Sequence, residues 1–215
     1  MKLNKKLVLP FLLAVLVYLL AYQIPKVTLP EYRLHYLNSS IDDLIQLWSP
    51  MFIIYIGAFF QWMYAIIIAS KQETNKGYKY ASAITIGSLI GFIIFMVYPT
   101  AIARPEVIGD GIFDKFARFI YSVDNVICAC PSFHCFCSTI TILILKDCKG
   151  INKNIVRNNE ILSVLVYIST LITKQHVLID IPCGILLAFI SMKIAEKITF
   201  TKIYDKLNKV LIKEN

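Results

Sequence analysis

Apolar residues along this chain stand in long uninterrupted blocks, without the alternation of a half-buried strand or the narrow stripe of a soluble helix. A helix needs about 20 predominantly apolar residues to cross the hydrocarbon core of a bilayer. The pattern therefore predicts an all-α, polytopic membrane protein, a bundle of six transmembrane helices. The six blocks run over 7–22, 47–70, 80–103, 132–146, 160–174 and 177–195.

The first block follows three lysines, Lys2, Lys5 and Lys6, which is the arrangement of a secretory signal peptide. The residues after the block, Tyr-Gln-Ile-Pro-Lys, offer no small-x-small cleavage site, so we expect a retained first helix. The fourth and fifth blocks are short for a span and polar at their outer ends. Ionisable side chains at such ends usually serve function.

The composition agrees with a membrane location. Of the 215 residues, 57% are hydrophobic and 17% are charged, whereas about a quarter of the residues of a soluble domain are charged. These values exclude an ordinary soluble domain. We expect one six-span membrane domain over 1–199, followed over 200–215 by a basic, amphipathic cytoplasmic tail that lies on the lipid surface.

The distribution of lysine and arginine orients the six blocks. With a cytoplasmic N-terminus and alternating helices, most of the 22 basic residues fall in cytoplasmic segments, as the positive-inside rule requires. Both termini are then cytoplasmic, in a plasma or inner membrane. The net charge of +8 belongs to loops that face anionic headgroups, so the expected partner is a lipid bilayer and not nucleic acid. The basic residues left outside are Lys26, Arg33, Arg104, Lys115, Arg118 and Lys174.

Three polar clusters fall on this same outer side. Arg104 and Pro105 follow the third block, 131–134 opens the fourth, and 174–176 joins the fifth to the sixth. His176 and Asp180 are four residues apart, a spacing at which two side chains share one face of a helix. The carboxylate can accept the N–H of one ring nitrogen, which fixes the tautomer and raises the basicity of the other nitrogen.

The same clusters predict an anion site. His134 stands near a helix N-terminus, where free backbone N–H groups favour an anion, and Pro131 suits the first helical position. Arg104 and Lys174 add positive charge. We therefore expect one pocket on the extracytoplasmic side that holds two histidines and binds phosphate.

The order and spacing of these residues resemble a known family. Arg-Pro, then Pro-Ser-x-His, then Ser169 followed by His176 and Asp180 is similar to the motif set of the type 2 phosphatidic acid phosphatase and vanadium haloperoxidase superfamily. The resemblance covers about 97–184. It implies that His176 attacks phosphorus and becomes phosphohistidine, that Asp180 orients it, and that His134 protonates the leaving alkoxide. It also implies that Arg104, Ser132 and Ser169 help to bind the phosphoryl oxygens without a metal or other cofactor.

Three positions depart from the family pattern. Val97 stands where the family has a lysine, Thr170 where it has an arginine, and Phe133 where it has a glycine. Lys174 is our own candidate for a replacement phosphate-binding cation. With these departures the chain looks more like the divergent branch that includes inositol phosphorylceramide synthase-like and sphingomyelin synthase-like proteins, which transfer a phosphoryl-linked headgroup.

The stretch Cys-Ala-Cys-Pro-Ser-Phe-His-Cys-Phe-Cys, 128–137, raises a separate question. Its cysteines stand in Cys-x-Cys pairs, whereas a zinc site usually has Cys-x(2–4)-Cys with a second ligand pair. We expect structural packing, with an outer disulfide through Cys128 or Cys130 and a metal site as the alternatives.

Three functional hypotheses follow. The first is an integral membrane lipid phosphatase that hydrolyses a lipid phosphate monoester or pyrophosphate at the outer membrane face. The second is a phospholipid or sphingolipid headgroup phosphotransferase, which uses the same His-His-Asp site to transfer the headgroup to a lipid hydroxyl. The third is a protein that binds a lipid phosphate without turnover, or a transporter-like protein. The sequence leaves the identity of the lipid and the oligomeric state open.

Overall fold

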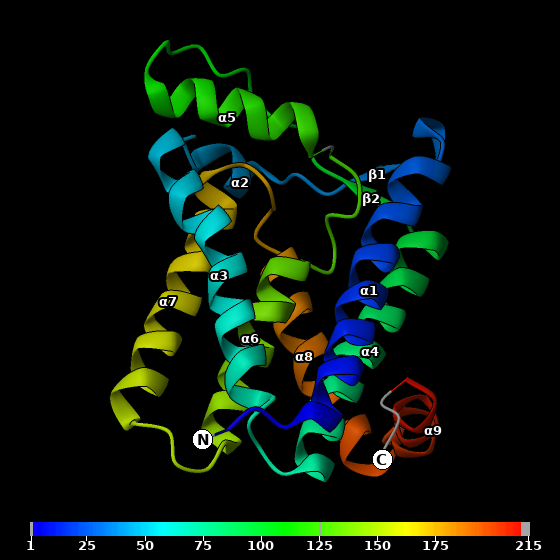
Figure 1. Ribbon diagram of the computed structural model, residues 1–215. Helices are drawn as coiled ribbons and strands as arrows, with labels where there is room; N and C mark the ends of the chain where they lie inside the picture. The colour runs from blue at the N-terminus through cyan, green and yellow to red at the C-terminus, as the bar shows by residue number, and fades with distance from the viewer. Residues whose placement is uncertain (1, 125, 212–215) are drawn as a thin grey trace.

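The computed structural model describes residues 2–124 and 126–211, which form a bundle of long helices with short connecting elements (Figure 1). The two strands, β1 and β2, pair in parallel through only two residues each. The elements in chain order are α1 Lys5–Thr28, η1 Glu31–Arg33, β1 His35–Tyr36, α2 Ser40–Leu44, η2 Ser49–Met51, α3 Phe52–Ala69, α4 Thr74–Val97, β2 Thr100–Ala101, α5 Ile112–Val123, α6 Phe133–Asp147, α7 Lys153–Ile172, α8 Asp180–Lys197 and α9 Thr201–Leu211.

Four segments of the described chain are long and apolar enough to cross a membrane: Lys5–Thr28, Ser49–Ala69, Thr74–Val97 and Lys153–Ile172. The two remaining long helices, α6 and α8, are shorter or less apolar; most residues of α6 are buried, whereas α8 exposes one face that includes Leu186 and Phe189. Helix α6 packs against α3, α7 and α8, while α8 also packs against α4, and α4 against α1. The all-helical architecture agrees with the sequence prediction.

The six expected blocks each coincide with a long helix, but several boundaries differ. Helix α4 begins at Thr74 and ends at Val97, although its block was expected over 80–103. It stops there because Tyr98 precedes Pro99, and a residue before proline is disfavoured in the α region. Helix α7 starts at Lys153, seven residues before its apolar block, with the Asn152 side chain accepting the N–H of Asn154 as a cap.

The close contact of α6 with α8 depends on a glycine. A Cβ atom on Gly184 would lie 2.4 Å from the carbonyl oxygen of Ser132 and 2.9 Å from the Cβ of Cys135. Any side chain at this position would push the start of α6 away from α8. Gly184 therefore lets the helix that carries His134 lie directly against the helix that carries Asp180.

Helix α1 is attached to the rest of the protein at both ends. Near its start, the Asn4 side chain donates to the carbonyl of Gln72 at 3.2 Å, and its own N–H donates to the carbonyl of Ser70 at 2.9 Å. Asn208 of α9 donates to the carbonyl of Lys6 at 2.9 Å. At the other end, Lys26 forms an ion pair with Asp124.

A cluster of polar side chains joins α3, α6 and α7 in the middle of the bundle. The amide nitrogen of Gln61 donates to the side-chain oxygens of Asn159 at 3.0 Å and Ser163 at 2.7 Å. The indole N–H of Trp62 donates to the hydroxyl of Ser138 at 3.0 Å. These buried groups satisfy one another, as a polar cluster between apolar helices must.

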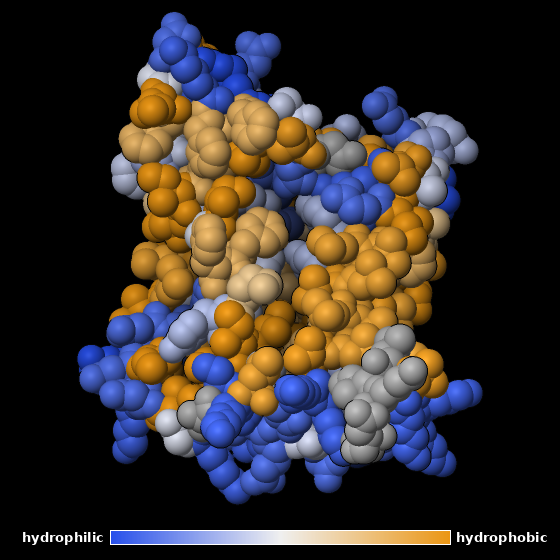
Figure 2. Space-filling model, viewed as in Figure 1, coloured by the Kyte–Doolittle hydropathy of each residue, from blue (hydrophilic) through white to orange (hydrophobic). Residues whose placement is uncertain are grey.

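The two ends of the bundle differ. The start of α1 and helix α9 lie at one end, whereas α2, α5 and the strands lie at the other (Figure 1). Between them, the visible surface is mostly hydrophobic, with hydrophilic residues gathered above and below (Figure 2). We call the end that carries α5 the α5 end.

Candidate active site

His176 and Asp180 lie together at the α5 end of the bundle. The Nδ1 atom of His176 is 3.1 Å from Oδ2 of Asp180, so an Nδ1–H donates to the carboxylate. The same carboxylate oxygen accepts the backbone N–H of Val177 at 3.0 Å. The sequence prediction assumed that one helix carries both residues, but His176 lies in the turn before α8 and Asp180 is the first residue of that helix. With the proton on Nδ1, the lone pair of the neutral imidazole is on Nε2.

His134 faces His176 from the first turn of α6. The centres of the two rings are 6.1 Å apart, and their planes make an angle of 59°. The ring of His134 is 6% exposed and stacks on Tyr55 at 4.0 Å, with Phe59 and Trp62 against its edges. Its Nε2 atom has no hydrogen-bond partner among the described residues.

Arg104 reaches the same region from the segment after β2. Its guanidinium group donates to the side-chain oxygen of Gln175, the neighbour of His176, and to the carbonyl of Asp124. The guanidinium carbon lies 4.8 Å from the centre of the Tyr121 ring, over its face. The segment is held by hydrogen bonds of Asn38 with the N–H and the carbonyl of Ala103, at 2.7 and 3.2 Å.

A partly buried ion pair that the sequence analysis missed stands beside these residues. Lys26, in the last turn of α1, binds the carboxylate of Asp124, and the Lys26 side chain is only 6% exposed. Tyr22 donates to the same carboxylate at 3.0 Å, and Tyr55 at 3.3 Å. Burial raises the pKa of Asp124, but the Lys26 ammonium, the Arg104 charge and the hydrogen bonds outweigh it and hold that pKa below its usual value.

Asp124 connects the two histidines through its neighbours. Its side chain accepts from Tyr55, the ring on which His134 stacks, and its carbonyl accepts from Arg104, which binds the residue next to His176. Lys26 was expected in an outer segment because the apolar block ends at Tyr22, yet α1 continues through Pro25 to Thr28. The sequence carries no signal that links these two residues, which are 98 positions apart.

The two predicted serines take structural positions. Ser132 is the N-cap of α6, and its hydroxyl oxygen accepts the N–H of Cys135 at 3.2 Å. Helix α6 therefore begins at Phe133, and Pro131 lies before the cap instead of at the first helical position. Ser169 is fully buried and donates to the carbonyl of Val166 at 2.7 Å, within its own helix α7.

Lys174 lies on another side of His176. It adopts a left-handed backbone conformation, with φ of 53°, and its ammonium group donates to the carbonyl of Asp42 at 2.6 Å. Lys174, His176 and Asp42 line one small cavity. The carboxylate of Asp42 accepts the N–H of Leu178 at 2.7 Å, so α2 supports the loop that carries His176.

The three departures from the family pattern have distinct environments. Phe133 points away from the site, where it stacks with Tyr18 at 5.4 Å and Tyr22 at 6.1 Å. Val97 is 72% exposed at the end of α4. The carbonyl of Thr170 accepts two backbone N–H groups at 3.0 Å, those of Gln175 and His176, and so closes the turn that presents His176.

The cysteines are free thiols, and no group of three His, Cys, Asp or Glu residues within 2–124 and 126–211 could hold a metal ion. Burial raises the pKa of Cys128 to about 12. The pKa of Cys130 is raised still further, first by burial and then by the nearby Asp180 carboxylate. Thiols that stay protonated are weak nucleophiles and weak metal ligands.

Comparisons of the chain with protein-family models, with curated proteins and with solved structures found no match. Any function must therefore be argued from the arrangement itself. It combines an imidazole oriented by a carboxylate with a second imidazole that faces it. Two cations lie nearby: Arg104 binds the neighbour of His176, and Lys26 shares the Asp124 carboxylate with the tyrosine on which His134 stacks. Such a set can attack an electrophile, transfer a proton and stabilise an anion.

Proposed function

We propose that this protein is an integral membrane phosphatase of the type 2 phosphatidic acid phosphatase kind, which hydrolyses a lipid phosphate monoester or pyrophosphate through a phosphohistidine. The observation that carries the proposal is the pair of histidine rings 6.1 Å apart, one of which is bound to Asp180. A phosphorus atom between the two rings would meet a nucleophile on one side and a proton donor on the other.

In the first step, Nε2 of His176 attacks phosphorus, a P–N bond forms and the P–O bond to the lipid breaks. Protonated His134 gives its proton to the departing alkoxide, which leaves as an alcohol. In the second step, His134 takes a proton from water, the resulting hydroxide attacks phosphorus, and the P–N bond breaks to release phosphate. Asp180 keeps the Nδ1 proton of His176 in place throughout, because its carboxylate accepts that proton's hydrogen bond.

Arg104 and Lys26 are the proposed cations for the phosphoryl oxygens. Both are held by Asp124, one through its carbonyl and the other through its carboxylate. In this role Lys26 takes the place of one of the two cations, a lysine and an arginine, that the family has at the positions of Val97 and Thr170. Lys174 binds the carbonyl of Asp42 and supports the loop of His176 from the other side.

The proposal includes six membrane spans, α1, α3, α4, α6, α7 and α8, with both termini in the cytoplasm. Helix α6, of 15 residues, is about 22 Å long, about 8 Å shorter than a hydrocarbon core of about 30 Å. We place His134, at the outer end of α6, on the side of the outer leaflet, where the bilayer thins locally to match the short helix. A tag after α9 should be protected from added protease in intact cells and should become cleavable only after lysis.

The test of the reaction is phosphate release by purified protein from a panel of lipid phosphates in detergent. His176→Ala and His134→Ala should each abolish release on every active substrate. His35→Ala is the matched control, because His35 is exposed and stacks on Tyr98 away from the two rings. Release that persists in His176→Ala would refute the assignment of the nucleophile.

The intermediate provides a second test. Brief reaction with a substrate labelled in its phosphate should leave label on the protein that is stable in base and lost in acid, as a phosphoramidate requires. His134→Ala should acquire this label much more slowly, because the departing alkoxide is no longer protonated, and His176→Ala should acquire none. If label passes to an added lipid alcohol faster than to water, the reaction is headgroup transfer and not hydrolysis.

A further inference from the structure

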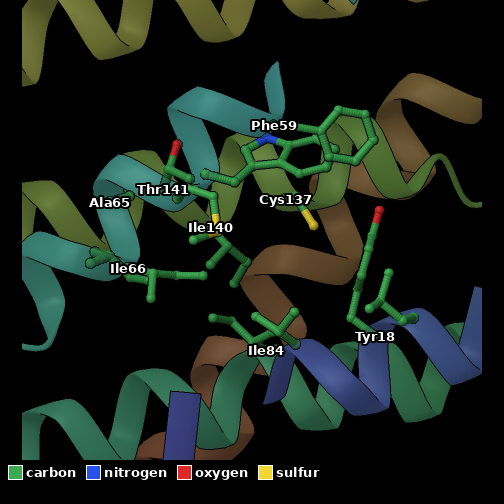
Figure 3. Close-up of a pocket in the computed structure, with 13 residues that line it drawn as sticks. Tyr18, Phe59, Ala65, Ile66, Ile84, Cys137, Ile140 and Thr141 are labelled. Atoms are coloured by element: carbon green, nitrogen blue, oxygen red, sulfur yellow. The ribbon is translucent and has the colours of Figure 1, made fainter. Parts of the chain in front are cut away.

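An apolar groove lies between α1 and α3, over α4 and α6, and Figure 2 shows the hollow between the two hydrophobic halves of the visible face. Side chains of all four helices converge on it in the close-up (Figure 3). We call this cavity the lateral groove. Its lining includes Val15, Tyr18, Phe59, Trp62, Cys137 and Ile140.

The lateral groove reaches the candidate active site through two of its own lining residues. Phe59 and Trp62 line the groove, and both also touch the ring of His134, at 5.6 and 5.1 Å between ring centres. The indole N–H of Trp62 is already bonded to Ser138, so the ring presents carbon atoms to the groove. Phe59 and Trp62 thus border both the phosphate site and the apolar groove.

The dimensions of the lateral groove fit one hydrocarbon chain. Its volume is about 120 Å³, similar to an engineered apolar cavity of about 150 Å³ that holds a single benzene molecule. On α3 it extends from Phe59 to Ile66, about 10 Å along the helix axis. Two chains side by side would not fit in this space.

We propose that the lateral groove binds one hydrocarbon chain of a phosphorylated lipid, while the phosphate lies at His176. This inference rests on the proposed function, which supplies the position of the phosphate. The groove opens within the apolar belt of the surface, so its occupant comes from the bilayer (Figure 2). Phe59 and Trp62 contact both the groove and His134. This proximity favours a chain attached to the reacting phosphate over the chain of an unrelated membrane lipid.

A groove that binds the chain makes activity depend on chain length. Each methylene group removed from an apolar site weakens binding about fourfold. A twelve-carbon alkyl phosphate should therefore react with a much higher kcat/KM than a four-carbon one. The difference should reach at least about tenfold if two or more methylene groups are buried in the groove.

Val15→Phe tests the groove, because Val15 is half-buried on α1 and lines it. We expect this variant to lower kcat/KM for dodecyl phosphate about tenfold, by displacing about two methylene groups, and to leave butyl phosphate unchanged. Leu16→Phe is the matched control on the same helix, because Leu16 is 50% exposed and does not line the groove. Equal loss on both substrates, or no loss on dodecyl phosphate, would overturn the inference.

A binding measurement separates the groove from catalysis. The chain has two tryptophans, and Trp48 is 58% exposed outside the groove, so Trp48→Phe leaves Trp62 as the reporter. The probe is a dodecyl phosphonate brominated in mid-chain, whose C–P bond is not hydrolysed, added to the protein in nanodiscs. Saturable quenching of Trp62, absent in Val15→Phe and with a brominated butyl phosphonate, is the expected result.

The hydrolysis assay and the quenching assay test the two proposals independently. If no lipid phosphate is hydrolysed but Trp62 is quenched as expected, the phosphatase proposal is wrong and the groove still binds a chain. If hydrolysis occurs with equal kcat/KM on long and short chains and quenching does not saturate, the reaction stands and the groove proposal is overturned. Quenching by a brominated two-chain bilayer phospholipid as strong as that by the phosphonate would also overturn it.

Discussion

Replacing Asp124 by asparagine should strongly destabilise the protein, because the change keeps the shape of the side chain and removes the partner of a buried cation. The Lys26 side chain is 6% exposed and the Asp124 side chain 19%. Breaking a buried ion pair costs about 3–5 kcal/mol, and an exposed pair contributes about 1 kcal/mol or less. Since Asp124 is partly exposed, we expect a loss of about 2–3 kcal/mol in the free energy of unfolding.

The assay is unfolding in mixed micelles by titration with sodium dodecyl sulfate, followed by circular dichroism. Asp110→Asn is the control, because Asp110 is 96% exposed and its pairing with Arg118 at 3.5 Å lies in solvent. It should leave stability unchanged. The double variant Lys26→Met, Asp124→Asn buries neither charge and should be more stable than Asp124→Asn alone. If the effects of the two single variants simply add, the ion pair does not carry the energy and the reasoning is refuted.

The pH dependence of the same pair has a defined sign. The folded-state pKa of Asp124 lies below its usual value of about 3.9, so the folded protein binds the proton less readily than the unfolded chain. The stability that the carboxylate contributes is therefore fully present above about pH 4 and is lost as the pH falls through the folded-state pKa. The stability gap between wild type and Asp124→Asn should close over that acidic range.

Three further predictions concern packing. Gly184→Ala should lower stability by about 1–3 kcal/mol in the same titration, since its Cβ meets the Ser132 carbonyl at 2.4 Å, whereas Gly57→Ala, with open space around it, should not. Ser132→Ala should cost about 1 kcal/mol through loss of the α6 cap, and an equal cost for Ser132→Asp would argue against capping. Gln61→Leu should cost about 1–3 kcal/mol by leaving buried acceptors unpaired; unchanged unfolding would refute that account.

The long helices could be predicted because their apolar blocks are recognisable in the sequence without any tertiary contact. The relation of His176 to Asp180 was also predictable, since four residues of separation bring two side chains together even where the first lies in a turn. Helix α5 was not predicted, although its spacing of Ile112, Phe116 and Phe119 is helical. Its polar neighbours made the stretch resemble a loop.

The contact between Lys26 and Asp124 could not be derived from the chain alone. The two residues are 98 positions apart, and nothing local to either indicates the other. The prediction missed the pair because it ended the first helix at position 22, whereas α1 continues for six more residues and places Lys26 on the helix. Ser169 shows the reverse case, in which a matching motif residue donates to its own helix.

The attachment of α1 at both ends has a mechanical consequence. Hydrogen bonds of Asn4 and Asn208 hold its first turn, and the Lys26–Asp124 pair holds its last. Its middle, which includes Val15, lines the hollow beside α3. If the lateral groove binds a lipid chain as proposed, the space between α1 and α3 would widen by outward bending of the middle of α1, while both ends of the helix stay attached.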